Sequence, residues 1–258
     1  MKAKLRKLLA VLLGLGAVVG IIGWIQSDLE KQEGREIYAD AADLSGDVQT
    51  EAMLQTAPEE EADPVALELG QMDLAALQEV NEDVVGWIAI PNTELSYPIV
   101  QGEDNDFYLD WTWNRERNSV GAIFLECQVS PDFDDFNTIV YGHRMRDGSM
   151  FGSLKHYRES AYWQEHPSVY IATDTFVRRY DIFAAHEAES KAITFGLGIS
   201  SPTKKQEFID FSLQQSVIDT GVVPLTSDRI LTLSTCTGRG YSTRWVVQAV
   251  LSLEIPGK

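Results

Sequence analysis

The segment that decides the fold is Arg229-Ile230-Leu231-Thr232-Leu233-Ser234-Thr235-Cys236, a β-type run that ends in a cysteine. Side chains of a strand alternate between its two faces, so Ser234 and Cys236 share one face. Glycines follow within a few residues and predict a turn, after which Arg244–Leu253 has the composition of a second strand. In such a hairpin, Arg244 returns beside Cys236.

Earlier in the chain, further runs of β-type residues are separated by turn residues such as Pro91-Asn92 and Asp147-Gly148. These runs are Val85–Ile90, Ser96–Val100, Ala122–Leu125, Thr138–Tyr141, Ser168–Ala172 and Tyr180–Ala185. About eight strands in ~170 residues predict a mainly β domain, either a barrel or a sandwich. Helical spacing predicts an amphipathic helix at Val65–Val80, before the first strand, and an inserted helix at Thr203–Val217, before the last strands.

Charge is distributed unevenly along the chain. The 258 residues include 21 basic and 39 acidic side chains, which gives a net charge of -18. Most of the excess acid lies in residues 26–83, which argues against a surface that binds nucleic-acid phosphates. The 2 cysteines are too few for a disulfide scaffold or a cysteine-ligated zinc site. We expect no metal and no cofactor, and we expect His156, His166 and His186 to be surface residues.

The N-terminus predicts a membrane anchor. Residues 8–25 are uncharged and span roughly 27 Å as a helix, close to the thickness of a bilayer core. Basic residues precede this run and acids follow it, which favours a cytoplasmic N-terminus. We therefore expect a cytoplasmic tail at 1–7, a single-pass transmembrane anchor at 8–25, an acidic extracellular stalk at 26–70 and an extracellular catalytic domain at 71–258. The alternative is a cleaved signal peptide, but the run is long and lacks a small-x-small end.

A histidine and a cysteine at strand ends suggest acyl-transfer chemistry. The apolar run Thr138–Tyr141 is followed by Gly142 and His143, which puts an imidazole at a strand terminus. In a Cys-His pair, the thiolate attacks a carbonyl carbon and the imidazolium protonates the leaving amine. A guanidinium at Arg244 would favour the thiolate of Cys236, or stabilise negative charge on a carbonyl oxygen.

Several motifs resemble those of class B sortases and occur in the same order. They are Thr232–Cys236 (TLSTC) with Arg244 after it, Tyr141–His143 (YGH), Asp147–Gly152 (DGSMFG), Val85–Ile88 (VGWI), Tyr97–Gln101 (YPIVQ) and Asp104–Leu109 (DNDFYL). The resemblance covers about residues 75–255. It departs from the family pattern at Arg144, where Asn is frequent, and in the loop after Cys236, which carries no acid.

The resemblance implies a fold and an activity. The fold is a closed eight-stranded β-barrel with N-terminal helices and an inserted helix before the last strands. The activity is that of a membrane-anchored cysteine transpeptidase. Such an enzyme cleaves the C-terminal sorting signal of a surface protein after its Thr, holds the product as a thioacyl enzyme, and transfers it to an amine of a peptidoglycan precursor, the cross-bridge of lipid II. An Asn-Pro type and a Pro-x-Thr-Gly type of signal are both compatible, and so is pilin joining instead of wall anchoring.

By motif match, the resemblance also implies residue roles. Cys236 is the nucleophile, His143 the general acid and base, and Arg244 the group that orients substrate and stabilises the oxyanion. The substrate groove is expected to include Ser234, Thr235, Asn105 and Leu109.

Other classes of thiol enzyme fit the sequence less well. In the cell-wall peptidases with a Cys-His pair the cysteine comes before the histidine, the reverse of the order here, and the compact L,D-transpeptidase pattern is absent. A disulfide between Cys127 and Cys236 would disable the proposed nucleophile, and we expect Cys127 to be a partly buried free thiol. A non-catalytic, stalked surface-binding module remains the alternative of a different class, and it predicts that Cys236 is dispensable.

Overall fold

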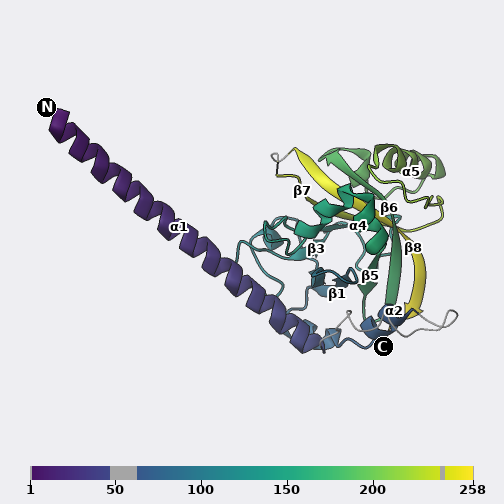
Figure 1. The fold of residues 1–258 in the computed structure, drawn as a ribbon. Coiled ribbons are helices and arrows are strands. Elements are labelled where there is room, and N and C mark those ends of the chain that lie inside the picture. The colour runs from purple at the N-terminus through teal and green to yellow at the C-terminus, as the bar shows by residue number, and fades with distance from the viewer. Residues whose placement is uncertain (1, 47–62, 239–241, 258) are drawn as a thin grey trace.

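The computed structural model describes residues 2–46, 63–238 and 242–257, with side chains from residue 19 onward. Its strands form a closed barrel in the order β1-β2-β3-β4-β7-β8-β6-β5, which confirms the barrel expected from the resemblance (Figure 1). The strands are β1 (Val84–Ala89), β2 (Ser96–Val100), β3 (Ile123–Leu125), β4 (Asn137–Tyr141), β5 (Ser168–Ala172), β6 (Phe176–Glu189), β7 (Ile230–Cys236) and β8 (Thr243–Pro256).

The pairing of β4 with β7 brings two distant segments to the same end of the barrel. The two strands are parallel, with Tyr141 opposite Ser234. Parallel strands end at the same edge of a sheet, so the residues after Tyr141 lie beside the last residues of β7. The antiparallel pair β7–β8 then places Arg244 opposite Cys236.

The strand β7 is buried on both faces. Leu231 and Leu233 of β7 belong to the main hydrophobic core, whereas Ile230 belongs to a second cluster on the outer side. That second cluster also contains Phe208 and Ile209 of the helix α5 (Pro202–Gln215). The inserted helix predicted before the last strands is therefore present, and its apolar side chains explain why nearly every position of β7 is buried.

Short helices complete the domain. They are α2 (Pro64–Leu69), α3 (Leu74–Val80), α4 (Ser160–Glu165) and the 3-10 helices η1 (Phe107–Leu109), η2 (Gly152–Arg158) and η3 (Ile193–Phe195). The single helix expected over residues 65–80 is wrong, because two helices with separate N-caps occupy this range. Asp63 accepts hydrogen bonds from the first turn of α2, and Asp73 accepts one from the first turn of α3.

The helix α1 (Lys2–Ser45) is long, and its C-terminal part packs against the barrel (Figure 1). Tyr38 and Ala41 are buried in the main core, although the range 26–70 is expected to be a solvated stalk. Gly34, Tyr38, Ala41 and Ser45 are spaced as one face of a helix, and all four are buried. The boundaries proposed for tail, anchor and stalk stay predictions, and residues 47–62 lie outside the described residues.

Among the residues whose side chains are described, no helix combines the length and the apolar character needed to cross a bilayer. Residues 8–18 of the predicted anchor are outside the part whose side chains are described.

Candidate active site

One cavity lies where β4, β7 and β8 meet. It has a volume of about 250 Å³ and is open to solvent. All of the residues singled out from the sequence line it: Asn105, Leu109, His143, Ser234, Thr235, Cys236 and Arg244. Four further lining residues were not predicted: Asp106, Phe124, Tyr141 and Gly142. Segments more than a hundred residues apart therefore converge on one cleft.

Cys236 is the last residue of β7 and is partly exposed. Its thiol is free, and so is that of Cys127, which excludes a disulfide between them. Burial raises the pKa of the Cys127 thiol, and the neighbouring Glu126 carboxylate raises it further. A raised pKa disfavours the thiolate of Cys127, which is the partly buried free thiol predicted from the sequence.

The backbone leading to His143 is bound to β7. Gly142 N donates to Ser234 O at 3.2 Å, and the buried Thr235 hydroxyl donates to Gly142 O at 2.7 Å. A Cβ atom on Gly142 would lie 2.8 Å from Cγ of the buried Phe151 ring, which explains the glycine at this position. The Thr235 side chain thus holds β4 against β7 at the strand end, next to both His143 and Cys236.

The imidazole of His143 has a defined hydrogen-bond partner. Its Nε2 lies 2.6 Å from the carbonyl oxygen of Leu109. A carbonyl oxygen can only accept, so Nε2 carries the hydrogen and Nδ1 of the neutral ring holds the lone pair. Nδ1 is then the nitrogen that remains for proton exchange.

Arg244 is partly buried on β8, directly across from Cys236. Its Nη1 donates to Thr243 O at 3.2 Å. Burial, followed by the Glu126 carboxylate, raises the pKa of Tyr141 well above its ordinary value, and the positive charge of Arg244 acts in the opposite direction. The guanidinium therefore acts electrostatically on the cavity wall formed by Tyr141.

A buried carboxylate, Glu126, organises that wall and was missed in the sequence. Its Oε2 accepts from Asn105 Nδ2 at 2.8 Å and from the Tyr141 hydroxyl at 3.0 Å. Asn105 Oδ1 accepts from Cys127 N at 2.9 Å, so both ends of the Asn105 carboxamide are oriented. The only signal for this role is an acid that directly follows the apolar run Ala122–Leu125.

Ser234 presents a hydroxyl to the same cavity. Its side chain is 1% exposed, and its Oγ has no hydrogen-bond partner among the described residues. A buried hydroxyl without a partner is unfavourable unless a ligand satisfies it. The substrate contact expected of Ser234 stays a prediction, and this hydroxyl is the group that would make it.

Arg144 connects the two segments that carry the cysteine and the histidine. Its Nη1 donates to the carbonyl oxygen of Thr237. Arg144 directly follows His143, and Thr237 directly follows Cys236. The contact stabilises the approach of the two strand ends, and no catalytic role is assigned to Arg144.

The remaining histidines lie away from the cavity. His186 is fully buried on β6, so the expectation of a surface residue is wrong. Its Nε2 lies 3.2 Å from the hydroxyl of Thr194 in η3, and burial lowers its pKa to about 4. In the described ranges, no group of three or more His, Cys, Asp or Glu side chains is arranged to hold a metal ion.

Comparisons with known proteins show which family this chain resembles. A family model described as "Sortase domain" matches residues 88–252. Sortase B of Listeria monocytogenes is 36% identical over 181 residues, which cover 69% of this chain and 74% of the relative. The crystal structure of Bacillus anthracis sortase B in complex with AAEK1 has a TM-score of 0.71 and 31% identity, and covers 86% of this chain and 98% of that one. A Staphylococcus aureus sortase B–substrate complex has a TM-score of 0.70 and 28% identity, and the match covers 87% of this chain and 98% of that one.

Proposed function

Because this chain belongs to the sortase family of cysteine transpeptidases and is similar to its class B members, we propose that Cys236 is its nucleophile, His143 its general acid and base, and Arg244 its oxyanion-stabilising residue. The observation that carries the proposal is the single cavity lined by all three side chains. A Cys-His pair with a fixed cation nearby contains the groups that acyl transfer requires.

In the first half of the reaction, the thiolate of Cys236 attacks the carbonyl carbon of the threonine in the sorting signal. A carbon–sulfur bond forms, and the carbonyl oxygen becomes an oxyanion that the Arg244 guanidinium stabilises. The intermediate then collapses, the carbon–nitrogen bond breaks, and His143 gives a proton to the leaving amine. The product is a thioester between the surface protein and Cys236.

In the second half, a primary amine attacks the thioester. A carbon–nitrogen bond forms, the bond to sulfur breaks, and His143 takes a proton from the attacking amine. The thiolate of Cys236 is the leaving group, so the enzyme returns to its starting state. A thioester suits transpeptidation because it reacts readily with amines and only slowly with water.

We propose that the acyl donor is a surface protein with a C-terminal sorting signal and that the amine belongs to the peptidoglycan cross-bridge of lipid II. The donor is supported by the solved complex of a similar sortase B with a substrate. Within the cavity, the orphan hydroxyl of Ser234 and the oriented carboxamide of Asn105 can bond to an extended peptide. Pilin joining would use the same chemistry with an amine on another pilin.

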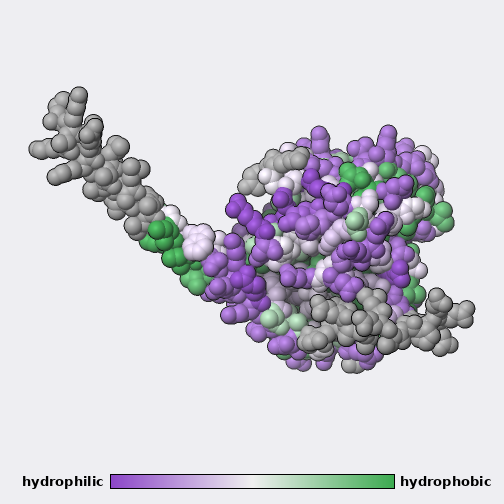
Figure 2. Space-filling model, in the orientation of Figure 1, coloured by the Kyte–Doolittle hydropathy of each residue, from purple (hydrophilic) through white to green (hydrophobic). Residues whose placement is uncertain are grey.

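We also propose that α1 anchors the protein in the cell membrane, with residues 8–25 in the bilayer, 1–7 in the cytoplasm and the barrel outside. Support comes from a band of exposed apolar side chains at the start of the described part of α1 (Figure 2): Val19, Ile21, Ile22, Trp24 and Ile25. Glu30 is hydrogen-bonded to Asn118 and Ser119 of the catalytic domain. Five residues of helix rise only about 7 Å, so the barrel would sit next to the membrane surface.

The deciding experiment is mass spectrometry of the protein after incubation with a small library of sorting-signal peptides of both types. We expect a mass increase equal to the peptide fragment that ends in threonine, and its loss on addition of a primary amine. The variant Cys236→Ala should keep the fold and form no adduct. Peptide cleavage by that variant would refute the nucleophile assignment, and no adduct with any peptide would favour the stalked binding module.

A further inference from the structure

The C-terminal half of α1 is bound to a segment that lies directly behind the imidazole of His143. Four hydrogen bonds join the two: Trp113 Nε1 to Ile37 O at 3.0 Å, Asn118 Nδ2 to Glu30 O at 2.9 Å, Ser119 Oγ to Glu30 Oε2 at 2.7 Å, and the Tyr38 hydroxyl to Gly121 O at 2.6 Å. Residues 113–121 are therefore held by a helix that is remote from them in the sequence.

Gly121 is the point where this segment contacts the imidazole. Its φ is +63°, a conformation that favours glycine. A Cβ atom here would lie 2.7 Å from Leu109 O and 2.8 Å from His143 Cδ2. The same Leu109 oxygen accepts the hydrogen of His143 Nε2. Gly121, the Leu109 carbonyl and the ring of His143 are therefore packed together, and a shift of Gly121 moves the surface on which the ring rests.

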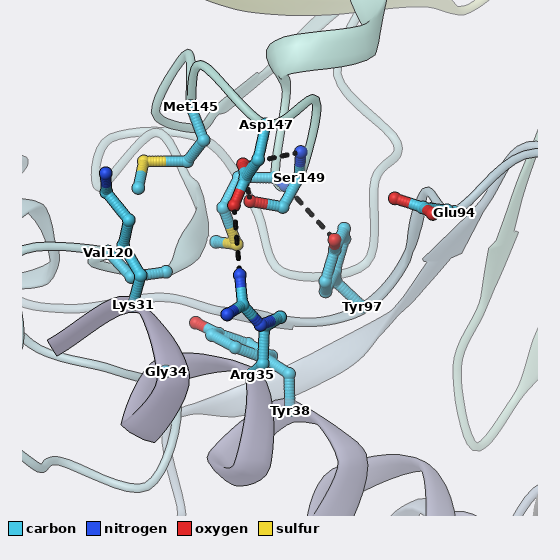
Figure 3. A pocket seen from close by; sticks show the side chains of 11 residues that line it. Lys31, Gly34, Arg35, Tyr38, Glu94, Tyr97, Val120, Met145, Asp147 and Ser149 are labelled. Carbon is cyan, nitrogen blue, oxygen red and sulfur yellow. Dashed lines mark hydrogen bonds and ion pairs between the residues drawn. The ribbon is translucent and has the colours of Figure 1, made fainter. Parts of the chain in front are cut away.

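Tyr38 is also linked to the loop on the other side of His143. Its ring packs edge-on against Tyr97, with the centroids 5.3 Å apart. The Tyr97 hydroxyl accepts from Met150 N at 3.1 Å, and Phe151 N donates to His143 O at 2.9 Å. Figure 3 shows Tyr38 on α1 facing Tyr97 and the loop that carries Asp147 and Ser149. Tyr38 therefore contacts the Gly121 support of the imidazole directly, and it is linked to the main chain of His143 through Tyr97 and residues 150–151.

The ion pair between Arg35 and Asp147 contributes less than Tyr38 to holding α1 against this loop. Arg35 Nη1 lies 3.4 Å from Asp147 Oδ2, and the two side chains are 56% and 37% exposed (Figure 3). Exposed ion pairs stabilise little. Tyr38 is buried instead, and its hydroxyl satisfies the carbonyl of a buried glycine.

We propose that Tyr38 is a positioning residue for His143, and that α1 therefore orients the acid–base group in addition to carrying the membrane anchor. The inference rests on the proposed role of His143. Proton transfer depends on the distance and direction of the imidazole, so a ring that tilts on a loosened support reacts more slowly. Leu109, an expected groove residue, touches this support through its main-chain carbonyl, so we expect the change to fall on kcat and to leave KM unchanged.

The test uses the full chain in detergent micelles and the variant Tyr38→Phe, which keeps the ring and removes one hydroxyl. With whichever fluorogenic peptide the wild type cleaves, of the Asn-Pro or the Pro-x-Thr-Gly type, we expect kcat to fall about tenfold at constant KM. A matched control is Tyr157→Phe, because Tyr157 is also buried and its hydroxyl donates to a carbonyl, His166 O, at 2.8 Å. The control should keep the wild-type kcat.

A second readout needs no substrate. In a chain labelled with carbon-13 at histidine, Tyr38→Phe should shift the Cδ2–Hδ2 resonance of His143 and leave those of the other three histidines in place. Tyr97→Phe, which removes the acceptor for Met150 N, should shift the same resonance. A wild-type kcat together with an unmoved resonance in Tyr38→Phe would overturn the inference. Activity of His143→Ala would instead refute the proposed role of His143, and the resonance shifts would still report on the positioning.

Discussion

Cys236 and Arg244 face each other across the β7–β8 pair, at the end of a register that runs unbroken from Ile230 opposite Val250. The seven residues of β7 all have partners on β8, so the sheet sets the spacing of the two backbone positions that carry the thiol and the guanidinium. Strand pairing is rigid compared with a loop, and a pre-oriented cation needs little reorganisation when charge develops on a substrate.

The first prediction concerns Arg244→Lys. Lysine keeps the charge and loses the planar fork of the guanidinium, so it cannot replace paired N–H donors directed at an oxyanion. We expect kcat/KM for a fluorogenic sorting-signal peptide to fall about 100-fold, similar to loss of one oxyanion donor in other enzymes. Arg229→Lys is the control, because Arg229 forms ion pairs with Asp134 and Glu254 outside the cavity. Near-wild-type rates for Arg244→Lys would contradict the assigned role.

The second prediction concerns Glu126→Gln. The amide would turn an N–H₂ group toward donors that now bond to carboxylate oxygens, including Asn105 Nδ2 and the Tyr141 hydroxyl. A mismatched buried polar group costs about 1–3 kcal/mol, so we expect urea denaturation to show a free energy of unfolding that is lower by that amount. We also expect KM to rise, because the Asn105 carboxamide is no longer oriented. The control Glu116→Gln, at an exposed carboxylate, should change neither the free energy of unfolding nor KM. A Glu126→Gln chain as stable as wild type would contradict the structural role given to Glu126 in the cavity wall.

Local patterns in the sequence predict most of the barrel, because alternating side chains and turn residues act over short distances. The predicted run Ser96–Val100 coincides with β2, and Ser168–Ala172 coincides with β5. Local patterns do not predict the register between strands that are distant in the sequence. β4 and β7 pair in parallel without a turn between them, so their alignment follows from packing that no local pattern encodes. The two strand ends suggested a Cys-His pair, and the resemblance of whole motifs was needed to expect His143 and Cys236 in one site.

The roles of Glu126 and Tyr38 depend on contacts across long sequence separations, which local patterns do not predict. Glu126 bonds to Asn105 and Tyr141, and Tyr38 bonds to Gly121, 83 residues away. The acidic composition of 26–83 suggested a solvated stalk, although a narrow helical stripe that includes Tyr38 and Ala41 is buried. Net charge describes the exposed face of such a helix and says little about the face that packs.

The third prediction concerns the N-terminus. Removal of residues 1–25 leaves every contact from Glu30 onward, so the shortened chain should be soluble and as active as the full one. Removal of residues 1–46 also deletes the buried Tyr38 and Ala41. Loss of a large buried side chain costs about 3–5 kcal/mol, so this chain should unfold at a clearly lower temperature. Calorimetry gives the unfolding temperature of each shortened chain, and peptide cleavage gives its activity. The prediction is contradicted if the chain without residues 1–25 needs detergent to stay in solution. It is also contradicted if the chain without residues 1–46 is as stable as the chain without residues 1–25.

The fourth prediction is a pH dependence of stability that originates at His186. Burial lowers its pKa from 6.5 to about 4, and its Nδ1 has no partner in the part of the chain that the structure describes. The unfolded chain therefore binds a proton near pH 6.5, whereas the folded chain binds it only near pH 4. Between these values the unfolded state holds more protons, so stability falls as the pH falls. Between pH 6.5 and pH 4, the free energy of unfolding therefore falls by about 3 kcal/mol.

The measurement is the free energy of unfolding in urea at a series of pH values between 7 and 4. We expect His186→Gln to be less stable than wild type at pH 7, because the ring is fully buried and packs edge-on near Phe211. Its stability should nevertheless decline less steeply than that of wild type on acidification. Other groups titrate in both chains, so the difference between the two curves isolates His186. Parallel curves between pH 6.5 and 4 would show that the imidazole is already protonated, or solvated, in the folded protein.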